Sequence, residues 1–425
     1  MGIHIAKSTS ERIVIIGGGF GGLELARRLR KTKYQVVVID KNNYHQFQPL
    51  FYQVATSGLE PSSIIFPFRK NFQKMSNFHF RLADVSGVDV VQKHVITSIG
   101  NIDYDHLVIA AGAGNNFFGN EEIQKYAFPM KSIQESLQLR NAILERFEDA
   151  LSIEPVNRAK YLTVAIAGAG PTGVELAGTL AEMKRYILPK DYPELDFKQM
   201  KIVLVEGAPR VLNAMSEVSS EKAHQYLEKL GVVVHVNTRV NSYNGEQIVL
   251  SSDSVIESKT LIWAAGIKGN FLDGLPDETL GRGNRILVDA YNAVIGLENV
   301  YAIGDVALMT TVQDYPDGHP QLAQVAIQQG KLLAKNFKRR LKDIPMTEFK
   351  YKNLGTMATI GRNKAVVELP KYKFQGFFAW TVWMLVHLRS ILGVKNKFLV
   401  FLNWVWNYFT YNLSLRLIIK RDKSS

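Results

Sequence analysis

Two glycine-rich segments have residue types and spacing suited to holding a dinucleotide. The first, residues 17–22, reads GGGFGG and fits G-x-G-x-x-G with Gly17, Gly19 and Gly22. In such a turn the first glycine makes the tight bend, and the second lets the backbone approach a pyrophosphate. The third lets the following helix lie close to the sheet. This segment therefore predicts a dinucleotide-binding turn.

The flanking residues have the pattern of a strand, a helix and a second strand. The apolar run 13–16 suits a strand buried on both faces, and a helix is predicted from Leu23 to Leu29. The N-terminal amides and positive dipole end of this helix face the expected phosphates. The second strand, 35–39, ends at Asp40, whose carboxylate is 18 positions after Gly22 and suits a ribose, for which the fingerprint expects about 20.

A second unit of the same design begins with a buried-strand run at 161–167. Residues 168–173 read GAGPTG, which places Gly168, Gly170 and Gly173 at the three glycine positions. The next strand, 201–205, ends at Glu206, after a proline- and charge-rich stretch at 185–200 that looks like an insertion. A glutamate there binds the ribose 2′-hydroxyl and repels a 2′-phosphate, which favours NADH over NADPH; Arg210 is near enough in sequence to moderate this preference.

Three further strand ends carry small or acidic residues. They are Ala111-Gly112, Gly266 and Gly304-Asp305, after predicted strands at 105–109, 260–264 and 299–303. Small side chains let a cofactor approach, and the Asp305 carboxylate either begins an ordinary turn or accepts a hydrogen bond from a ribityl hydroxyl of FAD. With two nucleotide units upstream, we prefer the FAD interpretation. Other predicted elements are hairpin strands over 78–95 and helices over 131–151 and 219–230.

Composition excludes several kinds of chemistry. The 425 residues include no cysteine, which excludes a disulfide scaffold, a thiolate metal site and a redox-active dithiol. The net charge of +12 is confined to the tail, because residues 331–425 hold 19 Lys and Arg against 4 Asp and Glu. The N-terminus shows neither an apolar signal region nor an arginine-rich transit segment, so we expect the catalytic part in the cytoplasm or on its side of a membrane.

Two segments combine amide and aromatic side chains. Loop 41–55 is either an ordinary connection with core aromatics or a wall of a flavin or substrate pocket; its His45 has no second ligand at metal spacing and is interpreted as structural. A helix predicted from Leu322 carries Gln324 and Gln328 on one face. These amides are either ordinary exposed side chains or donors to a quinone or to the flavin edge.

The tail, residues 376–421, is the most apolar part of the chain. Residues 398–415 form an uncharged run of 18, close to the roughly 20 needed to span a bilayer. On a helix, however, Asn403, Asn407, Thr410 and Ser414 form one polar stripe, with Phe401, Trp404, Tyr408 and Leu415 opposite. Basic residues flank both ends, so we favour amphipathic helices lying on anionic lipid. A packed core or a dimer interface is the structural alternative.

Together these segments resemble the type II NADH:quinone oxidoreductases, the single-subunit alternative NADH dehydrogenases. The resemblance rests on GGGFGG at 17–22, FQPL at 47–50, AGPTGVE at 169–175 and AQVAIQ at 323–328. It implies an α/β fold with two Rossmann-like dinucleotide-binding domains, for noncovalent FAD and for NADH, plus a C-terminal amphipathic helical membrane anchor. It also implies a homodimer, peripheral on the cytoplasmic side of the cell inner membrane.

The predicted domain boundaries follow the two fingerprints. They are 11–115 and 271–345 for the two parts of the FAD domain, 116–156 for a connecting helix, 157–270 for the NADH domain and 346–425 for the membrane-anchoring region. From the matching motifs, we expect Phe20, Lys41, Val85, Gln324 and Val325 at the FAD site and Thr172 at the NADH site.

The resemblance implies a hydride transfer from NADH to the flavin N5, followed by transfer of two electrons to menaquinone or ubiquinone, without proton pumping. Glu175, in the first turn of a helix whose dipole stabilises its anion, is expected to take part in proton delivery, with Gln324 and Gln328 beside the quinone. Its alternative role is helix-start electrostatics. Glutathione-reductase-like and sulfide:quinone enzymes share the paired fingerprints but work through cysteines, which this chain lacks.

Two other functions are compatible with two nucleotide sites. One is a flavoprotein reductase of a protein electron carrier such as ferredoxin or rubredoxin, which needs no aromatic tail. The other is an FAD- and NADH-binding redox sensor whose basic tail contacts nucleic acid. Long aromatic and aliphatic runs suit lipid better than a phosphate groove, so we predict no nucleic-acid partner.

Overall fold

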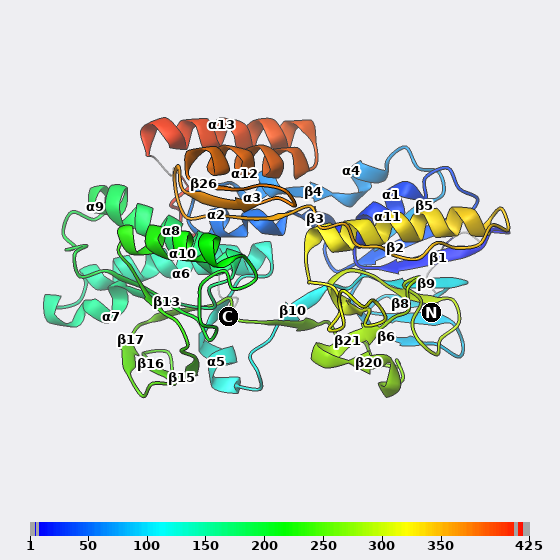
Figure 1. Cartoon of the computed structure of the whole chain (residues 1–425), viewed down its shortest axis with the longest axis horizontal. Coiled ribbons are helices and arrows are strands. Elements are labelled where there is room, and N and C mark those ends of the chain that lie inside the picture. The colour runs from blue at the N-terminus through cyan, green and yellow to red at the C-terminus, as the bar shows by residue number, and fades with distance from the viewer. Residues whose placement is uncertain (1–4, 6–7, 412–414, 420–425) are drawn as a thin grey trace. The chain divides into compact units, whose positions relative to one another are not determined.

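The computed structural model describes Ile5, residues 8–411 and residues 415–419 (Figure 1). The chain divides into two compact units. The first unit comprises residues 1–45, 66–114 and 267–353, and the second comprises residues 46–65, 115–266 and 354–425. Each unit contains a five-stranded parallel sheet, and the two sheets are built alike.

The sheet of the first unit has the strand order β22-β9-β1-β2-β5. Its strands are β22 (Val300–Ala302), β9 (His106–Ile109), β1 (Arg12–Ile16), β2 (Gln35–Asp40) and β5 (Phe78–Leu82), and every neighbouring pair is parallel. Parallel neighbours need a crossover, which α1 (Phe20–Arg28) provides between β1 and β2. Helix α11 (Ala323–Arg340) packs against α1.

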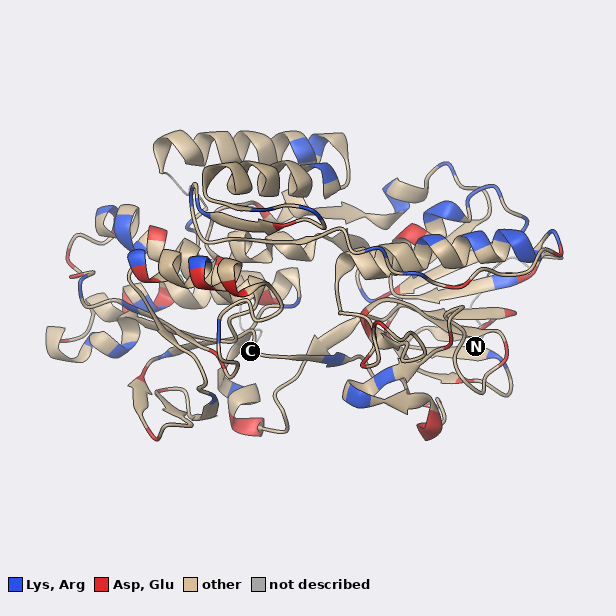
Figure 2. Ribbon diagram, viewed as in Figure 1, with Lys and Arg blue, Asp and Glu red and all other residues tan. Residues whose placement is uncertain are grey.

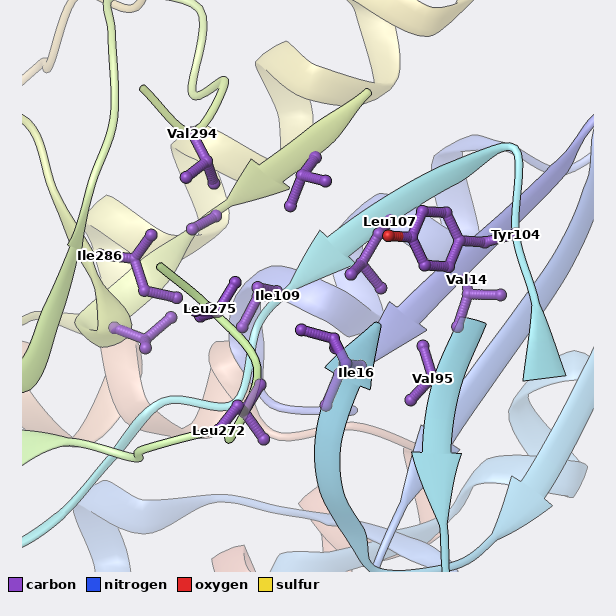
Figure 3. Packing of buried hydrophobic residues seen from close by; sticks show 14 of the residues in the cluster. Val14, Ile16, Val95, Tyr104, Leu107, Ile109, Leu272, Leu275, Ile286 and Val294 are labelled. Carbon is purple, nitrogen blue, oxygen red and sulfur yellow. The ribbon is translucent and has the colours of Figure 1, made fainter. Parts of the chain in front are cut away.

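One face of this sheet packs into a cluster of buried apolar residues. Figure 3 shows side chains from β1 and β9 packed with residues of the surrounding segments: Val14, Ile16, Val95, Tyr104, Leu107, Ile109, Leu272, Leu275, Ile286 and Val294. The small antiparallel sheet of β6 (Val85–Asp89), β7 (His94–Thr97) and β8 (Gly100–Asp103) contributes to this cluster. Because both faces of the parallel sheet are covered, its strands are continuous apolar runs.

The sheet of the second unit has the order β11-β18-β12-β13-β14. Its strands are β11 (Phe128–Pro129), β18 (Thr260–Trp263), β12 (Thr163–Ala167), β13 (Lys201–Val205) and β14 (Val232–His235), again all parallel. Helices α8 (Pro171–Tyr186), α10 (Glu217–Lys229) and α6 (Ile133–Leu151) belong to this unit. The predicted helices over 131–151 and 219–230 are thereby confirmed within two residues at each end.

The C-terminal part of the second unit is a small antiparallel sheet with two helices. The strands are β24 (Thr356–Thr359), β25 (Ala365–Glu368) and β26 (Lys373–Gln375). Helix α12 (Phe377–Ser390) packs on β25, and α13 (Val394–Thr410) lies beside α12, as the orange and red helices of Figure 1 show. Among the described helices, none combines the length and apolar character needed to cross a bilayer.

Shorter helices and strands complete the two units. They are β3 (Tyr44–Gln46), α2 (Phe51–Ala55), α3 (Pro61–Ile64), β4 (Ile65–Pro67), α4 (Phe68–Phe72), β10 (Ala113–Asn115), α5 (Glu121–Tyr126), α7 (Ala159–Leu162), α9 (Leu188–Asp191), β15 (Val240–Tyr243), β16 (Gln247–Leu250), β17 (Val255–Glu257), β19 (Ile267–Gly269), β20 (Leu280–Gly281), β21 (Arg285–Leu287) and β23 (Ala307–Leu308).

The predicted hairpin over 78–95 is wrong in its first strand. Strand β5 pairs in parallel with β2 at the edge of the main sheet, and the antiparallel pairing begins only with β6 and β7. The alternating pattern misled us because an edge strand of a parallel sheet is half covered, so it alternates as a hairpin strand does.

Candidate active site

The first glycine turn is shaped by close backbone packing. Gly17 has a φ of +98°, and its N–H donates to the Ile39 carbonyl at 2.8 Å. A Cβ at Gly17 would lie 2.4 Å from the Ala110 carbonyl oxygen, and one at Gly22 would lie 2.0 Å from the Gly17 oxygen. The first and third positions therefore need glycine for the protein's own packing.

The middle glycine, Gly19, differs from Gly17 and Gly22 because no protein atom packs closely against it. A Cβ at Gly19 would meet no protein atom within 4 Å, and the φ of Gly19 is −66°. Neither protein packing nor backbone conformation requires glycine here. The open space lies at the N-terminus of α1, where unsatisfied amides and the helix dipole favour an anion. These residues fit the pyrophosphate of FAD.

The second turn repeats this geometry. Gly168 has a φ of +99°, and its N–H donates to Val205 at 2.7 Å. A Cβ at Gly168 would lie 2.5 Å from the Ala264 oxygen, and one at Gly173 would lie 1.9 Å from the Gly168 oxygen. At Gly170 a Cβ would again meet nothing within 4 Å. The second turn thus fits a second pyrophosphate in the same way.

A carboxylate at the end of the neighbouring strand holds each turn. Asp40 accepts the Gly18 N–H at 2.7 Å and the Asn42 N–H at 2.7 Å on its other oxygen. Burial raises the pKa of Asp40, while these two hydrogen bonds act in the opposite direction. Glu206 likewise accepts the N–H groups of Ala169, at 2.6 Å, and Ala208, at 2.8 Å. A carboxylate oxygen can accept more than one hydrogen bond, so each acid can also bind ribose hydroxyls.

The predicted nucleotide residues collect at the carboxyl edge of each parallel sheet, where ligands of such folds bind. In the first unit this edge carries the glycine turn, Asp40, Ala111, Gly112 and Asp305; in the second it carries the other turn, Glu206 and Gly266. A Cβ at Gly112 would meet nothing within 4 Å, as at Gly19. This arrangement fits FAD in the first unit and NADH in the second.

The other expected contacts are more scattered. Phe20 begins α1, Lys41 follows β2 and is exposed, Val85 begins β6, Val325 is buried in α11, and Thr172 is exposed in the first turn of α8. Their roles stay predictions.

Three side chains support the turns at the edge that fits FAD, and of these only His45 was predicted to be structural. Buried Gln329 accepts the Gly304 N–H at 2.7 Å, and Gln321 donates to the Asp305 carbonyl at 2.9 Å. His45 donates from Nδ1 to the Gly18 carbonyl at 3.0 Å. Burial lowers the pKa of His45 to about 4, so this imidazole is neutral at pH 7 and holds the turn. Only the absence of metal spacing around His45 pointed to such a role.

The side-chain amide of Gln328 forms hydrogen bonds with the backbone of Lys352. Its amide nitrogen donates to the Lys352 carbonyl at 2.8 Å, and its oxygen accepts the Lys352 N–H at 2.9 Å. Gln324 lies in the first turn of α11. The quinone roles expected of the two glutamines stay predictions, and Gln328 has a clear structural task.

Glu175 is a buried carboxyl group in α8, with 6% of its surface exposed. One of its oxygens accepts Trp383 Nε1 at 3.1 Å and the Thr359 N–H at 3.3 Å. Burial raises the pKa of Glu175 to about 8, although both hydrogen bonds act to lower it. The anion expected from the helix dipole is therefore not the dominant form at pH 7, because desolvation outweighs the dipole. Glu175 is therefore mainly protonated at neutral pH, and its expected part in proton delivery stays a prediction.

An aromatic pocket of about 130 Å³ adjoins Glu175, and both of its hydrogen-bond donors line it. The lining residues are Tyr52, Gln53, Thr56, Gly58, Thr179, Glu182, Ile187, Thr359, Gly361, Arg362, Trp380, Trp383, Met384, Trp404, Asn407, Tyr408 and Tyr411. Trp404 donates to Gln53 at 2.8 Å, and Gln53 donates to the Tyr52 hydroxyl at 2.9 Å. Tyr52 and Gln53 of loop 41–55 thus line a pocket, and the flavin or substrate role that the sequence left open for this loop stays a prediction.

Arg362 joins this pocket to the end of α13. Its guanidinium donates to the carbonyls of Asn407 at 2.6 Å and Tyr408 at 2.7 Å, and it stacks on the Tyr411 ring at 3.5 Å from the centroid. A cation is favourable at this helix end because the last carbonyls carry partial negative charge. The Arg362 N–H donates to Glu182, whose pKa is raised by burial. These contacts were not predicted, because they join three segments that are distant in the sequence.

The polar stripe expected on the tail does not form one exposed face, which corrects our prediction: Asn407 points inward, whereas Thr410 is exposed. Asn407 donates to the Gly58 carbonyl at 3.2 Å, and Trp404 and Tyr408 share this inner side instead of lying opposite. The exposed side of α13 is mostly apolar; its large exposed apolar residues are Val394, Phe398, Leu399, Phe401, Leu402, Val405, Trp406 and Phe409. Ser414 lies outside the described residues. Both α12 and α13 are tan along most of their length in Figure 2, with blue near one end.

Two family models match the chain. Residues 11–330 match the pyridine nucleotide-disulphide oxidoreductase family, and residues 353–411 match the NDH2 C-terminal domain. The type II NADH:quinone oxidoreductase Ndh of Mycobacterium tuberculosis is 35% identical over 94% of this chain and 88% of its own. The chain belongs to the type II NADH:quinone oxidoreductases. NdhA of the same organism, also a type II NADH:quinone oxidoreductase, is 34% identical over 92% of this chain and 86% of its own.

The fold agrees with this membership. The structure of NDH2 from Plasmodium falciparum in complex with NADH is similar with a TM-score of 0.88, at 23% identity over 97% of this chain and all of that one. Both mycobacterial relatives are named for quinone, so the carrier-reductase and redox-sensor alternatives are not favoured. As a type II NADH:quinone oxidoreductase without cysteine, this chain has the fold of the disulphide oxidoreductases but not their dithiol.

The middle glycines allow a matched pair of variants. Because a methyl group fits the protein at either position, Gly19→Ala and Gly170→Ala are both expected to fold, and their nucleotide-free forms should melt at the temperature of the nucleotide-free wild type. Gly19→Ala is expected to weaken FAD binding at least about tenfold and leave NADH binding intact, and Gly170→Ala the reverse. FAD content and calorimetric binding of ADP-ribose measure the two effects. Loss of both ligands in either variant contradicts the assignment of one turn to each nucleotide.

The raised pKa of Glu175 predicts a pH-dependent stability. The unfolded carboxyl ionises near 4.5 and the folded one near 8, so the stabilisation that comes from this group is fully present below pH 4.5 and is lost as the pH rises to about 8. Relative to Glu175→Gln, the free energy of unfolding should fall by about 1.4 kcal/mol per pH unit across this window. Urea unfolding at several pH values measures it, with the exposed Glu221→Gln as control. Parallel pH profiles for wild type and Glu175→Gln contradict the burial argument.

Proposed function

We propose that the chain oxidises NADH with FAD as its resident cofactor and reduces a membrane quinone, with Glu175 as the proton donor on the acceptor side. The observation that carries the proposal is the repeated glycine turn with an open middle position, once in each unit. One turn suits a bound cofactor and the other an exchanging substrate. When bound, FAD accepts a hydride from NADH and returns two electrons to the quinone.

The chain's own residues bind and orient the two nucleotides. In the first unit, the α1 N-terminus, Asp40, Gly112 and Asp305 form the FAD edge, with Gln329 fixing the Gly304-Asp305 turn. In the second unit, Gly170 and Glu206 lie where the NADH pyrophosphate and ribose bind. Binding at fixed positions is the main contribution of a protein to flavin chemistry.

Proton balance gives Glu175 its role. Reducing a quinone to a quinol takes two electrons and two protons, whereas the hydride of NADH carries two electrons and one proton. The second proton must come from a group of the protein or from water. Glu175 is protonated at pH 7 and adjoins an aromatic pocket suited to a flat, apolar headgroup, so we assign the donation of this proton to it.

The apolar face of α12 and α13 supports docking on a membrane surface. Phe409 and Trp406, near the end of α13, are 77% and 57% exposed, and the basic residues Arg389, Lys395 and Lys397 lie at the end of α12 and the start of α13. Exposed aromatic and aliphatic side chains with basic neighbours suit the interface of anionic lipid. We propose a peripheral position on the cytoplasmic side, where NADH is available. We also propose that the protein is a homodimer and that its domains have the boundaries predicted from the sequence.

The activity is tested with purified, FAD-loaded protein. NADH oxidation should be rapid with a short-chain quinone and slow without it, and NADPH should be a poor donor because Glu206 repels its 2′-phosphate. The absorbance of the reduced nicotinamide measures the rate with and without quinone and with each of the two donors. If NADH reduces the flavin but quinone does not reoxidise it, the nucleotide assignments stand and the acceptor is wrong.

Membrane docking is tested by removing apolar side chains from the exposed face of α13. The variant Phe398→Ser, Leu402→Ser, Phe409→Ser should lose binding to anionic vesicles in a flotation assay, because apolar burial supplies much of the affinity. It should still oxidise NADH with a water-soluble quinone. The control Val91→Ser, Val218→Ser, Val255→Ser changes equally exposed residues elsewhere and should float as the wild type does. Unchanged flotation of the α13 variant contradicts this docking face.

A further inference from the structure

The loop after Glu206 is covered by a cationic side chain that the sequence did not single out. Arg239 lies between β14 and β15, and its side chain packs over Gly207. A Cβ at Gly207 would lie 3.2 Å from Cγ and 3.3 Å from Nε of Arg239. Gly207 does not have a positive φ, so backbone conformation does not require glycine there. Its missing side chain instead makes room for the arginine.

Backbone hydrogen bonds fix Arg239 beside the ribose carboxylate. The Thr238 N–H donates to the Glu206 carbonyl at 2.9 Å, and the Asn237 N–H donates to the Ala208 carbonyl at 3.0 Å. Arg239 itself exchanges two bonds with Ser251, donating its N–H to Oγ at 3.0 Å and accepting the Ser251 N–H at 2.8 Å. The base of the Arg239 side chain is therefore held in register with the Glu206 loop.

The guanidinium of Arg239 is exposed, and within the described part of the chain it forms no hydrogen bond or ion pair. Arg210, the arginine that the sequence suggested, differs. Its guanidinium forms an ion pair with Glu217 at 3.1 Å and donates to the Met215 carbonyl at 3.3 Å. These contacts hold the Arg210 side chain at the start of α10. Glu206 uses both oxygens on backbone N–H groups. Arg239 is thus the available cation at this site.

We propose that Arg239 binds the adenosine end of the nicotinamide dinucleotide and sets donor selectivity together with Glu206. A planar guanidinium can stack on the adenine ring, and it can also bind a phosphate through two hydrogen bonds. When Glu206 is present, the negative charge of its carboxylate repels a 2′-phosphate, and Arg239 contacts the adenosine of NADH. Without that carboxylate, the same arginine attracts the 2′-phosphate of NADPH. The inference rests on the proposed function only in taking NADH as the ligand of the second unit.

The first experiment measures ADP-ribose binding to the full-length, FAD-loaded protein by calorimetry. Arg239→Gln should weaken binding about tenfold and raise KM for NADH by a similar factor, whereas Arg239→Lys should recover little because lysine cannot stack as a plane. Arg210→Gln, the matched control, should bind ADP-ribose as the wild type does. An unchanged dissociation constant in Arg239→Gln overturns the proposal.

The second experiment asks whether the two residues act together. Glu206→Ser should bind 2′,5′-ADP at least about tenfold more tightly than the wild type, and Glu206→Ser with Arg239→Gln should lose that gain. A gain that persists in the double variant overturns the selectivity role. The binding measurements with ADP-ribose and 2′,5′-ADP use neither quinone nor turnover, so they can fail while quinone reduction succeeds. If instead ADP-ribose does not bind wild type at all, the NADH assignment itself is wrong, and Arg239 has no such role.

Discussion

Close approach of two backbones at the end of a parallel strand is the constraint on which both nucleotide sites depend. Gly17 and Gly168 lie within van der Waals contact of the carbonyl that ends the neighbouring strand, and Gly22 and Gly173 lie equally close to the turn itself. These contacts force the helix to begin directly above the strand end. The middle glycine then faces open space at the helix N-terminus, which is the position where a pyrophosphate fits.

A second constraint, the burial of Glu175, connects the nucleotide fold to the tail. The carboxyl group is covered by Trp383 of α12 and by the backbone of Thr359 in β24, both in the C-terminal part of the chain. The tail therefore has two tasks in the second unit. Its inner side desolvates a carboxyl group and raises its pKa, and its outer side presents an apolar surface. Both tasks follow from aromatic side chains on two helices.

The sequence predicted what local patterns determine. The two glycine turns, the acids at the strand ends and the α11 helix depend on residues close together in the chain, so spacing was sufficient. The β5 pairing was missed because alternation does not distinguish an edge strand from a hairpin. The pocket of Tyr52, Trp383 and Trp404 was missed because it joins segments more than 300 residues apart. The neutral state of Glu175 was missed because burial is a tertiary property that a helix position does not reveal.

Glu175 is proposed to donate a proton to the quinone, whereas hydride transfer from NADH to the flavin needs no proton from a carboxyl group. The most direct measurement is anaerobic stopped-flow absorbance of the flavin, which separates its reduction by NADH from its reoxidation by quinone. Glu175→Gln should keep the wild-type rate of reduction and slow reoxidation about a hundredfold or more. In the wild type, reoxidation should fall as the pH rises through about 8. Equal reoxidation rates in the two proteins, or a loss confined to the NADH step, would contradict this account.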